Sequence, residues 1–198
     1  MELNLDKTVA ALQENGIEVI VVETGTQALE KIKELVPVGV SVMNGSSVTL
    51  EQIGFVEYLK SGNHGWNNLH AAIVAEKDPV KQKELRKQAI NSDYYLGSVH
   101  ALTETGEFVV GSNSGSQLPH IVFSSPNLIF VVGTQKIVPT LSDAMKRLED
   151  YVVPLENKHM QEKHGVNTTL AKIVIFKKEN LRMGRKVRMI LVKEPLGY

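Results

Sequence analysis

In the first part of the chain, segments whose apolar residues have helical spacing alternate with segments that have the pattern of strands. Residues 5–14 carry apolar side chains at helical spacing, which predicts a helix. Residues 18–22 form a short β-branched run typical of a strand, and residues 24–36 return to helical spacing before Pro37. A second strand is expected at residues 38–43. The order helix, strand, helix, strand favours a parallel α/β sheet.

The following segment is predicted to be mostly helical. Thr49 and Gln52 have the spacing of a capping box at a helix start. Residues 55–61 and 67–77 carry further helical patterns. Residues 78–91 open on Asp-Pro, a strong helix start, and are highly charged, so we expect this helix to leave one face in solvent.

Short apolar runs and polar turns alternate in the centre of the chain. Residues 99–103 and 108–110 predict two strands joined by a turn at residues 105–106. Residues 111–116 are six small or polar residues without an apolar anchor. Residues 128–132 are apolar without alternation, which is typical of a strand covered on both faces.

The last part of the chain predicts a helix and two strands. Pro139-Thr140 begins a helix with an apolar stripe. Residues 152–169 have little periodicity, so a loop with a short helical piece is expected there. Residues 172–176 and 187–192 alternate, which predicts a C-terminal hairpin at a sheet edge. The whole pattern predicts an α/β fold, a largely parallel sheet flanked by helices, in one domain over residues 1–198.

Composition narrows the classes of function. The chain has 198 residues and an apolar fraction of 42%, enough for one sizeable core. Lysine plus arginine is 22 and aspartate plus glutamate is 22, and the net charge of zero disfavours nucleic-acid binding. No apolar run reaches membrane-span length, and residues 1–15 do not resemble a signal peptide. We therefore expect a cytoplasmic protein.

The sequence contains no cysteine. This excludes disulfides, thiolate catalysis and Cys-ligated zinc or iron–sulfur sites. None of the six histidines pairs with another at the i, i+4 spacing of a helical metal site. Neither a metal nor a cofactor is expected.

A small-residue turn after the strand at residues 38–43 is the first candidate for ligand binding. Gly45, Ser46 and Ser47 lead into a helix that contains Thr49. Free N–H groups and the positive end of the helix dipole favour an anion at such a turn. A simple helix cap explains the serines equally well.

Two residues are candidates for acid–base chemistry. Glu104 precedes the turn formed by Thr105 and Gly106, where a carboxylate serves either as a general base or nucleophile, or as a solvated hairpin acid. His120 follows the polar segment and is the best acid–base candidate among the histidines, with a packed histidine as the alternative.

The polar segment and one lysine complete the set of candidates. Asn113, Ser114 and Gln117 have side chains suited to hydroxyl groups of a ligand, or they belong to a surface loop. Lys136 follows the apolar strand near the carboxyl edge of the sheet and is suited to balance an anion. We expect the serine turn, the Glu104 turn and the polar segment to converge on one cleft that binds a small anionic metabolite.

Four motifs resemble the lactate-utilization (LUD) domain family. They are residues 45–54, 100–106, 131–140 and the ending 196–198. Their order and register cover most of the chain. Gly45-Ser46-Ser47, Glu104-Thr105-Gly106 and Lys136 match recurrent positions of this family.

The resemblance implies a three-layer fold similar to sugar-phosphate isomerases and CoA-transferases. It also implies a role in the bacterial system that oxidises L-lactate to pyruvate, in which partner subunits carry iron–sulfur clusters. Without cysteine, this chain matches only the cluster-free type of subunit. An isomerase or acyl-transferase that uses Glu104 is the alternative, and an interaction domain with a vestigial pocket is a third. Association of several copies into a homo-oligomer is compatible with the sequence.

Overall fold

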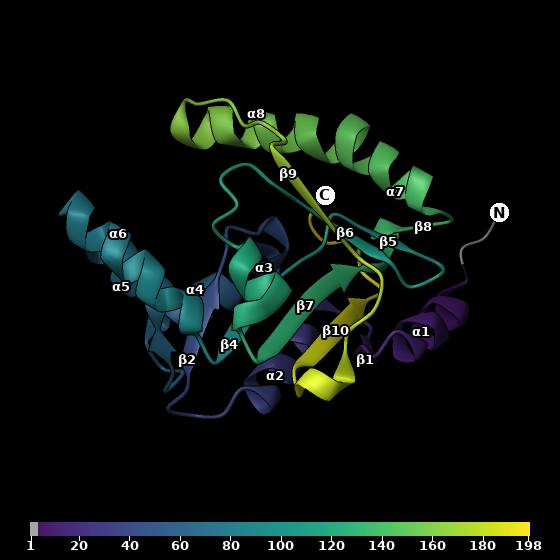
Figure 1. Ribbon diagram of the computed structural model, residues 1–198, viewed down its shortest axis with the longest axis horizontal. Coiled ribbons are helices and arrows are strands. Elements are labelled where there is room, and N and C mark those ends of the chain that lie inside the picture. Colours follow the sequence, from purple (N-terminus) through teal and green to yellow (C-terminus); the bar gives the residue numbers. More distant parts are fainter. Residues whose placement is uncertain (1–3) are drawn as a thin grey trace.

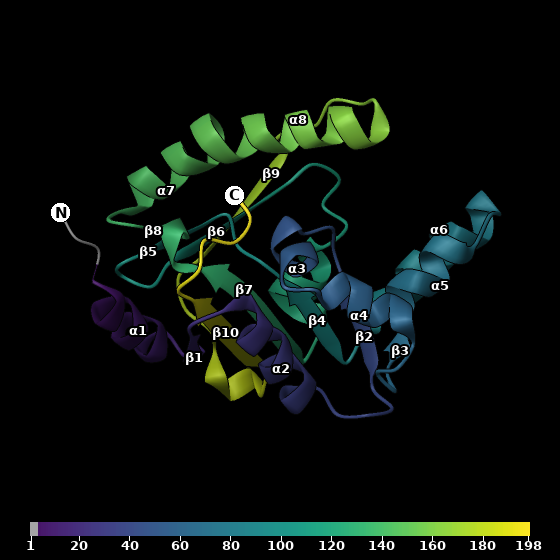
Figure 2. The same ribbon diagram turned by 180° about the vertical axis from the view of Figure 1, so that it is seen from behind.

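Two β-sheets are stacked face to face and covered by helices on their outer sides (Figures 1 and 2). The computed structural model describes residues 4–198. The main sheet has six parallel strands in the spatial order β1 (Glu18–Val22), β10 (Lys186–Val192), β7 (Asn127–Gly133), β4 (Tyr94–Gly97), β2 (Ser41–Asn44) and β3 (Asn67–Asn68). This confirms the predicted α/β class with a largely parallel sheet.

The second sheet has four strands and lies over one face of the main sheet. Its order is β8 (Ile137–Val138), β5 (Ala101–Thr103), β6 (Phe108–Ser112) and β9 (Lys172–Phe176). Strands β5 and β6 form the predicted hairpin, and β9 pairs antiparallel with β6.

Helices cover both sides of this stack. Their bounds are α1 (Leu5–Glu14), α2 (Gly25–Leu35), α3 (Val48–Gln52), α4 (Phe55–Ser61), α5 (Leu69–Ala75), α6 (Pro79–Gln88), α7 (Leu141–Arg147) and α8 (Val153–His164). A π-helical turn, η4 (Leu148–Val152), makes α7 and α8 nearly continuous across the second sheet (Figure 1). No helix within residues 4–198 is long and apolar enough to cross a membrane.

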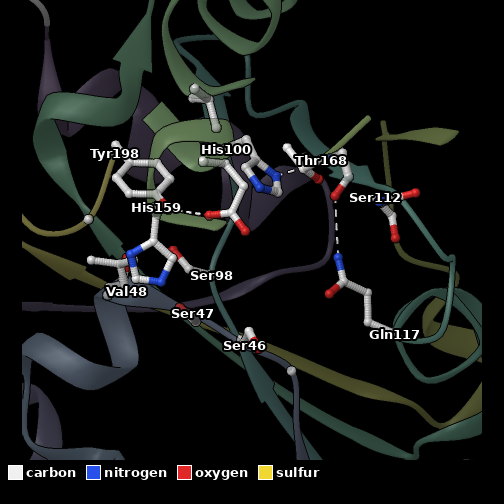
Figure 3. Close-up of a pocket in the computed structure, with 18 of the residues that line it drawn as sticks. Ser46, Ser47, Val48, Ser98, His100, Ser112, Gln117, His159, Thr168 and Tyr198 are labelled. Atoms are coloured by element: carbon white, nitrogen blue, oxygen red, sulfur yellow. Dashed lines mark hydrogen bonds between the residues drawn. The ribbon is translucent and has the colours of Figure 1, made fainter. Parts of the chain in front are cut away.

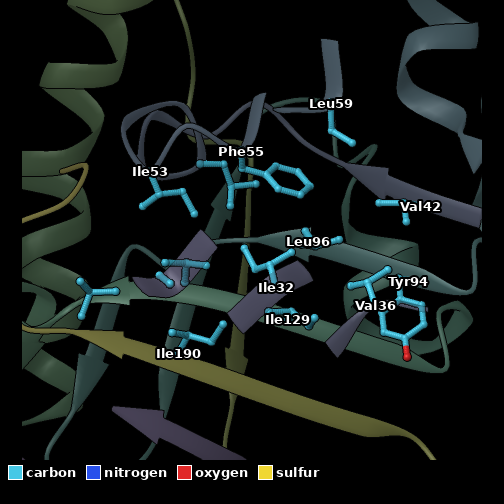
Figure 4. Packing of buried hydrophobic residues seen from close by; sticks show 14 of the residues in the cluster. Ile32, Val36, Val42, Ile53, Phe55, Leu59, Tyr94, Leu96, Ile129 and Ile190 are labelled. Atoms are coloured by element: carbon cyan, nitrogen blue, oxygen red, sulfur yellow. The ribbon is translucent and has the colours of Figure 1, made fainter. Parts of the chain in front are cut away.

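Strand β7 is buried on both faces, as its unbroken apolar run predicts. Ile129 and Val131 pack into the core beneath α2, α3 and α4, where Figure 4 shows Ile129 near Ile32 of α2. Phe130 lies on the opposite face and contacts Phe108 of β6, with ring centroids 5.4 Å apart. The alternating side chains of β7 thus join the two halves of the core.

Most helix starts follow the predicted capping chemistry. Thr24 caps α2 in a full capping box with Gln27. Asp78 caps α6, and Pro79 occupies its first turn. The predicted helix at residues 67–77 begins two residues later, because Asn67 and Asn68 pair with β2 as the short strand β3.

The predicted C-terminal hairpin is wrong. Strand β10 lies inside the main sheet, parallel to β1 and β7, whereas β9 belongs to the other sheet. The reason lies in the apolar run from Met189 to Val192, which is buried on both faces of the sheet.

The predicted loop at residues 152–169 is also wrong over most of its length. Helix α8 occupies Val153–His164 and ends on Gly165 in the left-handed conformation. None of its residues is fully buried, so it lacks an apolar stripe. The π-helical turn before it also shifts the phase of the apolar positions.

Candidate functional site

A cavity of about 290 Å³ lies at the carboxyl edge of β2, β4 and β7. These strands are neighbours in the main sheet, so the segments that follow them meet at one place. Gly45–Ser47 follow β2, Ser98–His100 follow β4, and Lys136 follows β7. The residues after β6 and helix α8 form the opposite wall, and Figure 3 shows polar side chains from both walls around the opening.

The serine turn forms one wall, as predicted. A Cβ at Gly45 would lie 2.8 Å from the Tyr95 hydroxyl oxygen and 3.1 Å from Gln117 Oε1, so glycine lets the turn pass between them. Ser47 is the helix cap, because its Oγ accepts from the Leu50 N–H at 3.3 Å. The predicted capping box from Thr49 is therefore wrong, and Thr49 lies inside α3.

Lys136 is the buried charge in the cavity wall, which Glu51, Glu156 and Lys163 also line. Its side chain is only 2% exposed, and its Nζ donates to Thr49 Oγ1 at 3.1 Å, Ser98 Oγ at 3.1 Å and the Val99 carbonyl at 3.2 Å. No carboxylate within residues 4–198 lies at ion-pair distance from this ammonium group. Burial, with a smaller effect of the Arg147 charge, lowers the pKa of Lys136 to about 7.

The three partners of Lys136 determine what the site offers to a ligand. Thr49 and Ser98 both accept from the lysine; the Thr49 hydroxyl keeps its own proton for another acceptor, whereas the Ser98 hydroxyl donates to the Val99 carbonyl at 3.4 Å. The lysine charge polarises both hydroxyl groups. Gly197 passes close by, since a Cβ there would lie 2.3 Å from Thr49 Oγ1 and 3.1 Å from Lys136 Nζ.

The polar segment after β6 lies beside the serine turn, as predicted. Ser112, Asn113, Ser114 and Gln117 all line the cavity. Gln117 donates from Nε2 to the Gly111 carbonyl at 3.3 Å, which fixes the amide across the base of the loop. Asn113 and Ser114 are exposed, so they lie at the rim of the cavity.

His100 is a cavity residue that the sequence analysis did not select. Its Nδ1 accepts from the Gly111 N–H at 3.0 Å, so the neutral ring carries its proton on Nε2. Burial first, then the charges of Lys136 and Arg147, lower the pKa of His100 to about 4. The ring is therefore neutral at pH 7, and its Nε2–H is available to donate a hydrogen bond.

Helix α8 supplies the rest of the wall and was missed because this segment was predicted as loop. His159, which Figure 3 labels, and Glu156 both line the cavity, and Glu156 accepts a hydrogen bond from the Tyr198 hydroxyl. Lys163 of α8 pairs with Glu51 of α3 at 3.1 Å. These two contacts connect α8 to the opposite side of the opening.

A family model described as the LUD domain matches residues 5–193. The chain belongs to the LUD domain family. This LUD domain also resembles the crystal structure of a DUF162 family protein from Deinococcus radiodurans, with a TM-score of 0.54 and 10% identity over 95% of this chain and 94% of that chain. That likeness shows a shared fold alone. No curated protein matches the sequence significantly.

In this LUD domain, Glu104 does not reach the cavity. The carboxylate accepts from the Asn4 N–H at 3.0 Å and pairs with Lys7 at 3.0 Å, and these contacts lower its pKa. The turn formed by Thr105 and Gly106 packs on α1, at the end of the β5–β6 hairpin remote from His100 and the cavity. The predicted single cleft therefore contains the serine turn and the polar segment but not the Glu104 turn.

His120 is a packed histidine in this LUD domain. It is 2% exposed, its ring stacks on Tyr95, and its Nδ1 lies 3.1 Å from Ser92 Oγ and 3.2 Å from Ser125 Oγ. Burial lowers its pKa to about 4. The ring does not line the cavity, so the structure gives no geometry for its predicted acid–base role.

Proposed function

We propose that this LUD domain is a cluster-free subunit of a lactate-oxidising system that binds a small anionic metabolite, a 2-hydroxy or 2-oxo acid. The observation that carries the proposal is Lys136, a buried cation in a cavity wall with three neutral oxygen partners. Buried charges are usually paired, so an anionic ligand is the missing partner.

The hydroxyl groups around Lys136 support a carboxylate as that anion. Thr49 has a proton to donate, Ser98 has one if its 3.4 Å hydrogen bond to the Val99 carbonyl is exchanged, and Ser46 and Ser47 present further hydroxyls on the same wall. A carboxylate accepts several such hydrogen bonds at once. The volume of about 290 Å³ suits a small metabolite.

The same cavity argues against the two alternatives. An isomerase or acyl-transferase that uses Glu104 requires that carboxylate beside the ligand, but Lys7 and Asn4 hold it elsewhere. A vestigial pocket would be filled by apolar side chains, whereas polar side chains line much of this one. Electron transfer in this proposal belongs to partner subunits with iron–sulfur clusters, because the chain has no cysteine ligands.

A thermal-shift screen with lactate, pyruvate, phosphosugars and CoA tests the proposal. A ligand that binds only the folded state stabilises it by about 2.7 kcal/mol at a hundredfold excess over Kd. Lactate or pyruvate should raise the melting temperature of the wild type and of Lys31→Met, whose lysine lies on the surface of α2, but not of Lys136→Met. No shift in the wild type, or equal shifts in all three proteins, would refute the proposal.

A further inference from the structure

We propose that Lys136 is a nucleophile that forms an imine with the carbonyl carbon of a 2-oxo acid. This inference rests on the proposed function for the identity of the ligand, but it assigns a covalent step that binding alone does not require. It starts from the position of Nζ in the cavity wall and from the neutral character of every group that contacts it.

The contacts of Nζ differ from those of a structural lysine. A structural ammonium group usually faces a carboxylate, and such a carboxylate would hold the proton on the lysine. Lys136 instead contacts two hydroxyl oxygens and one carbonyl oxygen. The neutral amine has two N–H groups for these three oxygens, so one of the three contacts must be released, or reversed by a hydroxyl that donates to the lone pair.

The hydroxyl groups of Ser98 and Thr49 are placed for the proton transfers. Both lie 3.1 Å from Nζ and both residues line the cavity. The amine lone pair attacks the C2 carbonyl carbon, and the carbonyl oxygen takes a proton through a hydroxyl group. The proton that the oxygen takes comes from the amine, which gives a carbinolamine. The carbinolamine then loses its hydroxyl group with the second amine proton as water, which leaves a C=N bond to Lys136.

The protonation state of Lys136 agrees with this step. Burial lowers its pKa to about 7, so a large fraction of the lysine is the neutral amine at neutral pH in the protein before the ligand binds. For a surface lysine with a pKa of about 10.4, the neutral fraction at pH 7 is smaller by about a thousandfold. This difference should direct a carbonyl compound to Lys136 over the surface lysines.

Reductive trapping tests the inference directly. The full chain is incubated with pyruvate and sodium borohydride, digested, and mapped by mass spectrometry, with lactate as the ligand that has no carbonyl group. We expect a reduced adduct on Lys136 that exceeds any surface lysine by about tenfold or more. Lys136→Arg, which keeps the charge, should lose the adduct, and Ser98→Ala should form it more slowly while its melting temperature stays near that of the wild type.

The outcomes separate this inference from the proposed function. Pyruvate that raises the melting temperature of the wild type without an adduct on Lys136 overturns the imine and leaves the binding site intact. Absence of both the shift and the adduct overturns both proposals. The imine is also overturned if the label is spread evenly over the surface lysines, or if Lys136→Arg carries as much label in total as the wild type.

Discussion

At the residue scale, the proposed anion site depends on one buried lysine that has no ion-pair partner within residues 4–198. Lys136 is buried among neutral oxygens, and burial lowers its pKa from 10.5 to about 7. Its place was predictable, because it follows an apolar strand whose carboxyl end meets the serine turn. The absence of a carboxylate beside Lys136 was not predictable, because it depends on where Glu104 and Glu156 point in the folded chain.

The lowered pKa of Lys136 predicts a pH-dependent stability. Between pH 7 and 10.5 the unfolded lysine is protonated and the folded lysine is not, so the free energy of unfolding rises with pH in this window. The slope from one proton is at most about 1.4 kcal/mol per pH unit. Urea denaturation should show this slope in the wild type relative to Lys136→Met. Parallel curves for the two proteins would mean that Lys136 keeps an ordinary pKa.

Gly106 offers a second residue-scale prediction. Gly106 and Gly39 both have φ of +86°, but a Cβ at Gly106 would lie 2.9 Å from the Ala11 backbone, whereas Gly39 has nothing within 4 Å. Gly39→Ala should cost about 1 kcal/mol of strain. Gly106→Ala should cost a further ~1–3 kcal/mol, because the hairpin must separate from α1. Equal losses in chemical denaturation would contradict the packing of the Glu104 turn on α1.

At the element scale, the long helical layer over the second sheet was the hardest part to predict. The helix α8 has no buried stripe, and η4 interrupts the helical phase, so residues 152–169 carry no clear signal. Strand β10 was misplaced for another reason. Its burial on both faces depends on β1 and β7, which are distant in sequence.

Leu148 of η4 tests how this layer is held. It is 1% exposed and packs with Ala101 and Val109 of the second sheet while also lining the cavity. Leu148→Ala should lower the free energy of unfolding by about 2–5 kcal/mol. Val80→Ala, at a side chain that is 77% exposed on α6, should change it by no more than about 0.5 kcal/mol. A loss below 1 kcal/mol for Leu148→Ala would mean that the helical layer is not anchored there.

At the scale of the whole molecule, two buried neutral histidines predict sensitivity to acid. The pKa values of His100 and His120 are lowered from 6.5 to about 4, so both protonate more readily in the unfolded chain. Stability from this source is present above pH 6.5 and is lost as pH falls toward 4, by up to about 1.4 kcal/mol per pH unit for each histidine. His120→Asn should remove one of the two contributions from the acid slope of unfolding. An unchanged slope would show that His120 titrates normally.

The meeting of distant segments at one edge explains which parts of the site were predictable. The serine turn and Lys136 follow strands of the parallel main sheet, which brings them to one edge, whereas the polar segment reaches the same cavity from the end of β6 in the second sheet. Glu104 follows β5 of the same second sheet, but β5 and β6 are antiparallel, so its turn lies at the other end of the hairpin and packs on α1. The sequence pattern does not distinguish the two sheets.

The most direct measurement is the pKa of Lys136 itself, followed by NMR of its ¹⁵N-labelled side chain with and without lactate. The signal is assigned by its absence in Lys136→Met. The buried, unpaired ammonium predicts a pKa of about 7 in the free protein and a rise when a carboxylate binds beside it. A pKa near 10.5 in the free protein, or one that saturating lactate does not change, would contradict a cavity built to hold an anion on Lys136.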